Sequence, residues 1–149
     1  MLATVLPFVS SFFPNPSAIV YSTINNIYTY RDNFRVVRYY PTNVIEYKAI
    51  RTNAHVESDF HSSLAAALSM ISRDRANMQI LNAPMNHFTL TSYYYQGAAW
   101  HFNFDYVWRG GVVAFDNEFA QGINMTHAIE VEVVNNQVTS YRRLNLNFE

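Results

Sequence analysis

The sequence contains no cysteine and only one lysine, four glycines and five prolines among its 149 residues. The absence of thiols excludes a disulfide framework, thiol catalysis and thiolate metal sites. With a formal net charge of -1, the chain also lacks the clustered cationic side chains that nucleic acid or a charged membrane surface requires. So few glycines exclude collagen-like and glycine-rich low-complexity chains.

Hydrophobic residues make up 50% of the chain and charged residues 14%, a balance that excludes intrinsic disorder. A chain of this length buries roughly two thirds of the surface that it exposes when unfolded, so one core is sufficient. We therefore expect a single domain over residues 1–149, with a division into 1–55 and 56–149 as the alternative. Met1–Phe13 is uncharged, too short to span a bilayer and without a signal-peptide flank, so we expect an ordered strand or packing segment there.

Short segments rich in β-branched and aromatic residues fill the first half of the chain, as is typical of strands. Four strands are predicted: Ala18–Ile24, Ile27–Arg31, Phe34–Tyr40 and Val44–Ile50. They are separated by Asn25-Asn26, Asp32-Asn33 and Pro41-Thr42-Asn43. Because Asn and Asp tolerate the left-handed backbone of tight hairpins, these separators predict an antiparallel meander.

The hydrophobic period changes to that of a helix between Ser58 and Ala76. The predicted buried stripe consists of Phe60, Leu64, Ala67, Leu68, Ile71 and Arg75. Ser58 is the predicted N-cap, and Asp59 suits the positive end of the helix dipole. The sequence thus predicts one long helix that packs on a sheet.

The strand pattern returns after Pro84. The predicted strands are Asn86–Tyr95, Ala98–Arg109, Gly111–Phe115, Thr126–Asn135 and Gln137–Phe148, with turns at Gln96-Gly97, Arg109-Gly110 and Asn135-Asn136. In the last hairpin, Glu130 and Glu132 can lie opposite Arg142 or its neighbours. The fold class is therefore α+β, with antiparallel meanders before and after the helix. The pattern leaves open whether the two meanders form one sheet.

Catalytic motifs are scarce in this sequence. The five histidines show no metal-ligand spacing, and neither a Gly-x-Ser-x-Gly elbow nor a phosphate-binding glycine loop occurs. We therefore expect no catalytic residue, no metal and no cofactor. The enzyme alternative is a hydrolase built on Asp105, Asp116 or Glu118 with His101.

Aromatic residues are the most unusual feature, at 16% of the chain. Three consecutive tyrosines, Tyr93, Tyr94 and Tyr95, must place rings on both faces of a strand. Trp100 and Trp108 belong to an even-numbered aromatic stripe on the next strand. Such a stripe packs in a core, stacks on a glycan or forms a protein interface, so these five residues are the predicted partner- or ligand-binding residues.

Three stretches together resemble the extracytoplasmic region of the YycH family. The opening Phe12–Ile19 resembles the family's phenylalanine and proline-flanked turn, and Tyr28–Tyr47 resembles its repeated tyrosine-turn-strand pattern. Phe104–Val107, Ile129–Val133 and Val138–Arg143 resemble its closing strands. The order and spacing agree over most of the chain, and the neighbouring YycI family is the alternative relative.

This resemblance implies a non-enzymatic regulatory module on the extracytoplasmic face of the cell membrane. The implied partners are a sister protein of the YycI type and the ectodomain of the WalK/YycG sensor histidine kinase of a two-component system that controls the cell wall. Family members are anchored by an N-terminal transmembrane helix that this chain lacks, so the chain itself is expected to be soluble. Binding of a cell-wall glycan or a small ligand is the alternative function.

Overall fold

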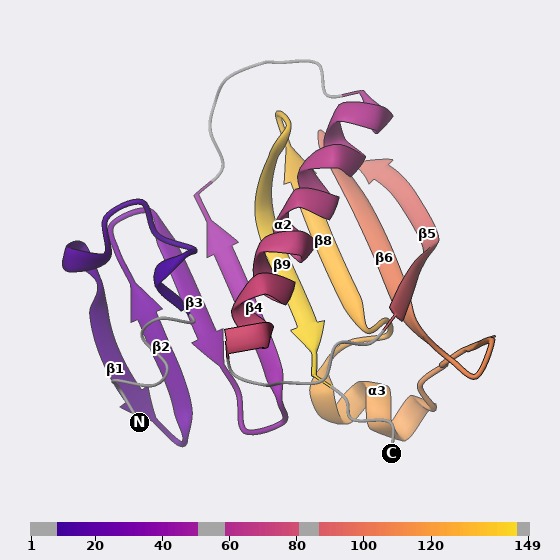
Figure 1. The fold of residues 1–149 in the computed structure, drawn as a ribbon, viewed down its shortest axis with the longest axis horizontal. Helices are drawn as coiled ribbons and strands as arrows, with labels where there is room; N and C mark the ends of the chain where they lie inside the picture. Colours follow the sequence, from indigo (N-terminus) through magenta and orange to yellow (C-terminus); the bar gives the residue numbers. More distant parts are fainter. Residues whose placement is uncertain (1–8, 51–58, 81–86, 146–149) are drawn as a thin grey trace.

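The two predicted groups of strands join into one antiparallel sheet of nine strands (Figure 1). The computed structural model describes residues 9–50, 59–80 and 87–145. The strands are β1 (Val20–Ile24), β2 (Ile27–Arg31), β3 (Arg35–Tyr39), β4 (Val44–Ala49), β5 (His87–Gln96), β6 (Ala99–Trp108), β7 (Gly111–Val112), β8 (Ile129–Val134) and β9 (Gln137–Leu144). Their order is β1-β2-β3-β4-β9-β8-β6-β5, with β7 beside β6. The two groups meet where β4 pairs with β9, which places Glu46 opposite Arg142.

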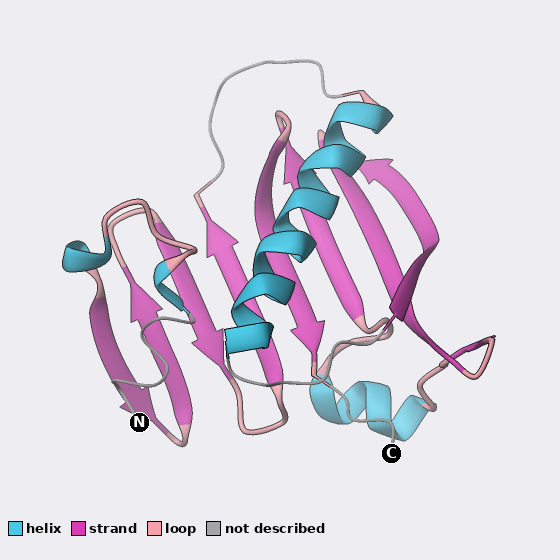
Figure 2. Ribbon diagram, viewed as in Figure 1, coloured by secondary structure: helices cyan, strands magenta, loops and turns pink. Residues whose placement is uncertain are grey.

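The α+β class is confirmed, and the predicted strands in the described residues are present within a few residues of their expected bounds. The exception is the predicted strand Gly111–Phe115, which is a strand only over Gly111–Val112. Among the elements that lie wholly within the described residues, two are α-helices: α2 (Phe60–Ile80) across one face of the sheet and the short α3 (Asn117–Ile123) beside the sheet (Figure 2). The sequence pattern predicts only the first of them.

Asp59 caps α2, one residue later than predicted. Its carboxylate accepts hydrogen bonds from the backbone N–H of Ser62 at 2.7 Å and from the Ser62 hydroxyl at 3.0 Å. These bonds lower the pKa of Asp59, because they favour its ionised form. The predicted cap, Ser58, lies outside the described residues.

The buried face of α2 differs from the predicted stripe at Leu68, which is 40% exposed. The helix buries Ser63, Ala67, Met70, Ile71 and Asp74. Leu68 follows Ala67 by one position, which is about 100° around the helix and therefore at the margin of the contact face. The predicted Arg75 side chain lies outside the described part of the structure.

The main core lies between α2 and the sheet face beneath it. Side chains of seven strands contribute to this core, among them Tyr30, Val37, Ile45, Phe102, Phe104, Val131 and Tyr141. The even-numbered aromatic stripe of β6 is buried at Phe102, Phe104 and Tyr106, so core packing explains its central part. The Tyr106 hydroxyl donates to the carbonyl of Leu144 at 2.5 Å, which satisfies the one polar atom that this ring brings into the core.

Four hairpins turn on pairs of residues that both have positive φ, the backbone of a type I′ turn. These pairs are Asn25–Asn26, Gly97–Ala98, Arg109–Gly110 and Asn135–Asn136. Three of them are predicted, and the fourth lies one residue beyond the predicted Gln96-Gly97 because Gln96 still pairs with Ala99. Ala98, at φ 62°, is poorly suited to its position, since its Cβ is crowded in the left-handed region.

α3 and a small second core lie on the face of the sheet opposite α2. Asp116 caps this helix by accepting the N–H of Phe119 at 2.8 Å. Ile123 and Met125 then pack against Val44 and Leu144 at the junction of β4 and β9. The second core therefore covers the end of the junction between the two groups of strands.

A buried polar cluster connects α2 to β9. Asp74, with no exposed surface, pairs with the guanidinium of Arg143 and accepts the Tyr141 hydroxyl at 2.5 Å. Burial and the Asp74 carboxylate raise the pKa of Tyr141 well above its usual value. Burial opposes the charge of Arg143, but the Asp74 carboxylate outweighs it, so the pKa of Arg143 is raised as well.

Asp74→Ala should lower the free energy of unfolding by about 3–5 kcal/mol, because it leaves the buried Arg143 charge without a partner. Urea unfolding measures this loss, and Ser72→Ala on the exposed side of α2 is the control, with an expected effect within about 0.5 kcal/mol. The double variant Asp74→Leu/Arg143→Leu should regain most of the loss, since no buried charge remains. A loss below about 1 kcal/mol in Asp74→Ala would contradict this role.

Ala98→Gly should raise the free energy of unfolding by about 1 kcal/mol, because glycine adopts the left-handed conformation without the Cβ crowding. Gly97→Ala is the matched variant in the same turn and should lower the free energy of unfolding by a similar amount, at φ 61°. Thermal unfolding measures the stability of Ala98→Gly and of Gly97→Ala. Equal stability of the two variants would contradict a left-handed backbone at these positions.

Candidate functional site

β5 forms one edge of the sheet and has neither a charged residue nor a proline to protect it. Its ten residues, HFTLTSYYYQ, pair on one side with β6. No strand of the described residues pairs with its outer side. Natural sheet edges are usually blocked by charge, proline or a covering element, because free backbone N–H and C=O groups accept a further strand. The described residues therefore leave the outer backbone groups of β5 without a strand partner.

Four aromatic side chains gather where β5 and β6 meet the start of α2, and we call them the β5 aromatic patch: Phe60, Tyr93, Tyr95 and Trp100. The ring centroid of Phe60 lies 4.8 Å from that of Tyr93 and 5.5 Å from that of Trp100. Tyr95 lies 5.2 Å from Trp100. Tyr93 packs on Phe60, and Tyr95 packs on Trp100. Both tyrosines are 55% exposed, so the patch faces solvent.

The five residues predicted to bind a partner do not form one surface. Tyr93, Tyr95 and Trp100 share the patch, whereas Tyr94 lies on the other face of the sheet and stacks on His101 at 4.5 Å. Trp108 is eight residues from Trp100 along β6, about 26 Å at the usual rise, and has the guanidinium of Arg109 over its ring. The alternation of side chains along β5 and β6 could not predict that Phe60 joins the patch, because Phe60 is the first residue of α2.

The face of the sheet opposite α2 carries a row of paired charges across neighbouring strands. Arg142 of β9 lies 3.2 Å from one oxygen of Glu46 and 4.0 Å from Glu130. Arg38 of β3 lies 3.4 Å from the other oxygen of Glu46, which also accepts the Tyr40 hydroxyl. The predicted alignment of Glu130 with Arg142 is confirmed, and the central role of Glu46 comes from a strand pairing that the sequence pattern leaves open.

Arg142 also holds the end of α3. Its guanidinium donates to the carbonyls of Asn124 at 2.5 Å and Ile123 at 3.3 Å. A cation at this point satisfies helix carbonyls that lack intrahelical partners and complements the negative end of the helix dipole. One side chain therefore neutralises the carboxylates of the sheet and positions α3 beside them.

Asp105 and His127 form a second polar cluster on this face. The Asp105 carboxylate accepts the Thr91 hydroxyl at 2.6 Å and the backbone N–H of Ala128 at 3.3 Å, and lies 2.9 Å from Nδ1 of His127. The carboxylate fixes the orientation of the imidazole ring, as the acid does in a catalytic triad. Within the described chain, Nε2 of His127 meets no serine, threonine or other hydrogen-bond partner, so a nucleophile is not part of this arrangement.

The residues named for the hydrolase alternative have separate partners. Asp105 pairs with His127, and Asp116 caps α3. His101 stacks on Tyr94 and lies four residues from Asp105 along β6, about 13 Å at the usual rise. Across the described ranges, no three His, Asp or Glu side chains are placed to hold a metal ion.

No protein-family model, curated protein or solved structure matches this chain. Among the described residues, no helix combines the length and apolar character needed to cross a bilayer.

Arg142→Gln should lower the free energy of unfolding by about 2–3 kcal/mol, because Glu46 is nearly buried and α3 loses its C-terminal donor. The control is Arg38→Gln, which removes a different partner of Glu46. The Arg38 side chain is 38% exposed, so this change should lower the free energy of unfolding by at most about 1 kcal/mol. Urea unfolding of both variants measures the difference, and equal losses would contradict the central role of Arg142.

Proposed function

We propose that this chain is a non-enzymatic binding module that recognises a partner protein through the open edge of β5. The observation that carries the proposal is the combination of an uncharged ten-residue edge strand with the exposed rings of Tyr93 and Tyr95. Tyrosine and tryptophan are enriched at protein interfaces, where they supply large contact areas with little loss of side-chain entropy.

An extended segment of the partner can add to β5 as a further strand. Its backbone would pair with the outer N–H and C=O groups of β5, and its side chains would alternate between the two faces of the sheet. On one face they would meet Tyr93 and Tyr95, and on the other Tyr94 stacked on His101. The edge thus supplies affinity through the backbone and selectivity through the rings on both sides.

The resemblance to the YycH family supplies the class of partner. We infer an extracytoplasmic module of a two-component system, whose partners are a sister protein of the YycI type and the ectodomain of a sensor histidine kinase. The module would reach the membrane through a transmembrane helix outside this chain. Protein recognition suits the patch better than glycan stacking, because Tyr93 and Tyr95 are tilted by 52° and 54° against their neighbours and offer no flat platform.

Titration with the two partner ectodomains tests the proposal, with tryptophan fluorescence, to which Trp100 contributes, as one readout and hydrogen exchange of the β5 amides as another. We expect saturable binding that protects the β5 amides. Tyr93→Ser/Tyr95→Ser should weaken this binding about tenfold or more, because both rings leave the interface. The control is Tyr21→Ser at the other edge of the sheet, an exposed tyrosine that should leave binding unchanged.

Absence of binding to both ectodomains would overturn the proposal. If Tyr21→Ser weakened binding as much as Tyr93→Ser/Tyr95→Ser does, the β5 edge would be excluded as the interface. A fluorescence response to cell-wall glycan fragments, without any response to the ectodomains, would favour the glycan-binding alternative instead.

A further inference from the structure

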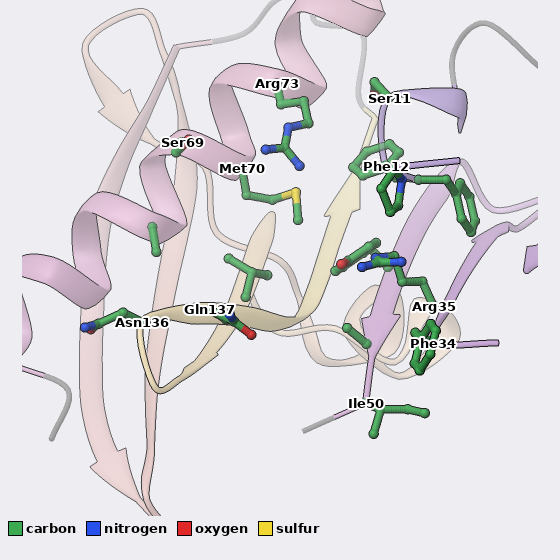
Figure 3. Close-up of a pocket in the computed structure, with 16 residues that line it drawn as sticks. Ser11, Phe12, Phe34, Arg35, Ile50, Ser69, Met70, Arg73, Asn136 and Gln137 are labelled. Atoms are coloured by element: carbon green, nitrogen blue, oxygen red, sulfur yellow. The ribbon is translucent and has the colours of Figure 1, made fainter. Parts of the chain in front are cut away.

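A cavity of about 1010 Å³ opens between α2 and the strands of the first meander, on a different part of the molecule from the β5 aromatic patch. Its walls come from α2, from β3 and β4, from the segment before β1 and from the β8–β9 turn (Figure 3). The volume lies at the upper end of the range for small-molecule sites. It is therefore large enough to hold a ligand with a long apolar chain.

The charged side chains that line the cavity are both cationic. The side chains of Arg73, from α2, and Arg35, from β3, extend into it from opposite walls (Figure 3). Arg35 is already paired with Asp32 at 3.0 Å, whereas Arg73 has no ion pair or hydrogen bond with any described residue. Among the described residues that line the cavity there is no aspartate or glutamate, so within this part of the chain one guanidinium charge has no counter-charge.

Asp32 stays ionised, and its negative charge therefore neutralises Arg35. Burial opposes ionisation of Asp32, but the backbone N–H groups of Phe34 and Arg35 and the Arg35 guanidinium outweigh it. The pKa of Asp32 is accordingly lowered from its usual value. The net charge offered to a ligand is thus that of Arg73 alone.

Large apolar side chains make up much of the remaining lining of the cavity. Buried Phe12, Tyr47 and Met70 form part of its wall. Phe34 and Ile50, which also line it, are 62% and 66% exposed. Two large apolar side chains left in water beside an unpaired cation form a surface that an amphipathic anion would cover.

We propose that this cavity binds a monocarboxylate that carries an apolar chain. The single uncompensated charge suits a monoanion better than a phosphate dianion, and a planar carboxylate matches the two parallel donors of a guanidinium. The chain of the ligand would lie against Phe34 and Ile50 and remove them from water. This ligand site goes beyond the proposed protein recognition at β5 and does not depend on it.

Isothermal titration with dodecanoate, below its micelle concentration, tests the proposal. We expect dodecanoate to bind at one saturable site. Butanoate, which lacks the long chain, and dodecanol, which lacks the charge, should each bind at least about tenfold more weakly. Arg73→Gln should weaken dodecanoate binding about tenfold or more. The control Arg31→Gln changes an exposed arginine that does not line the cavity and should leave binding unchanged.

Phe34→Ser tests the apolar side. It should weaken dodecanoate binding severalfold, because the chain loses an exposed contact, whereas Ile24→Ser, 70% exposed on β1, should not. Both positions are exposed, so the variants should retain their thermal stability. Tyr93→Ser/Tyr95→Ser should also bind dodecanoate normally, which separates this site from the proposed protein interface.

The proposal is overturned if dodecanoate does not bind, if Arg73→Gln binds it as tightly as the unchanged protein, or if dodecanol binds equally well. Tighter binding of dodecyl phosphate than of dodecanoate would overturn the assignment of a carboxylate.

Discussion

The buried ion pair between Asp74 of α2 and Arg143 of β9 fixes the position of the helix on the sheet. Neither charge is tolerable in the core without the other, and Asp74 also requires the Tyr141 hydroxyl. Sliding α2 by one turn would leave both charges buried and unpaired. Because the helix is held there, Phe60 at its start reaches the β5 aromatic patch and Arg73, next to Asp74, reaches the cavity. Both proposed binding surfaces therefore depend on this pair.

The two faces of the sheet have different chemistry and different roles. Beneath α2 the face is apolar and builds the main core, while the opposite face pairs its own charges through Glu46 and Arg142. Charges that neutralise one another within the sheet offer little to a partner, because breaking these pairs would cost as much as new ones return. The two proposed recognition sites lie where neither device operates, at the β5 edge and at the cavity, where Arg73 has no ion pair with any described residue.

Local features of the fold could be predicted from the sequence, and features made by distant residues could not. Asn135–Asn136 forms the predicted turn because its backbone preference is intrinsic, and three consecutive tyrosines must alternate between faces. Ser58 and Asp59 are both good caps, so sequence alone could not decide between them. α3 escaped prediction because its seven residues are too few to show a helical hydrophobic period, although its cap, Asp116, is local. The patch and the cavity likewise require contacts between α2 and the sheet that no local pattern contains.

The pairing of β4 with β9 has a consequence for biosynthesis. The two strands that join the halves of the sheet are nearly a hundred positions apart, as Glu46 and Arg142 show. While the chain is being made, the first meander leaves the ribosome with the inner edge of β4 uncovered until β9 follows. Its buried residues Val44, Ile45 and Tyr47 are meanwhile available to other nascent chains. Such long-range closure predicts slow folding and a need for protection by chaperones during synthesis.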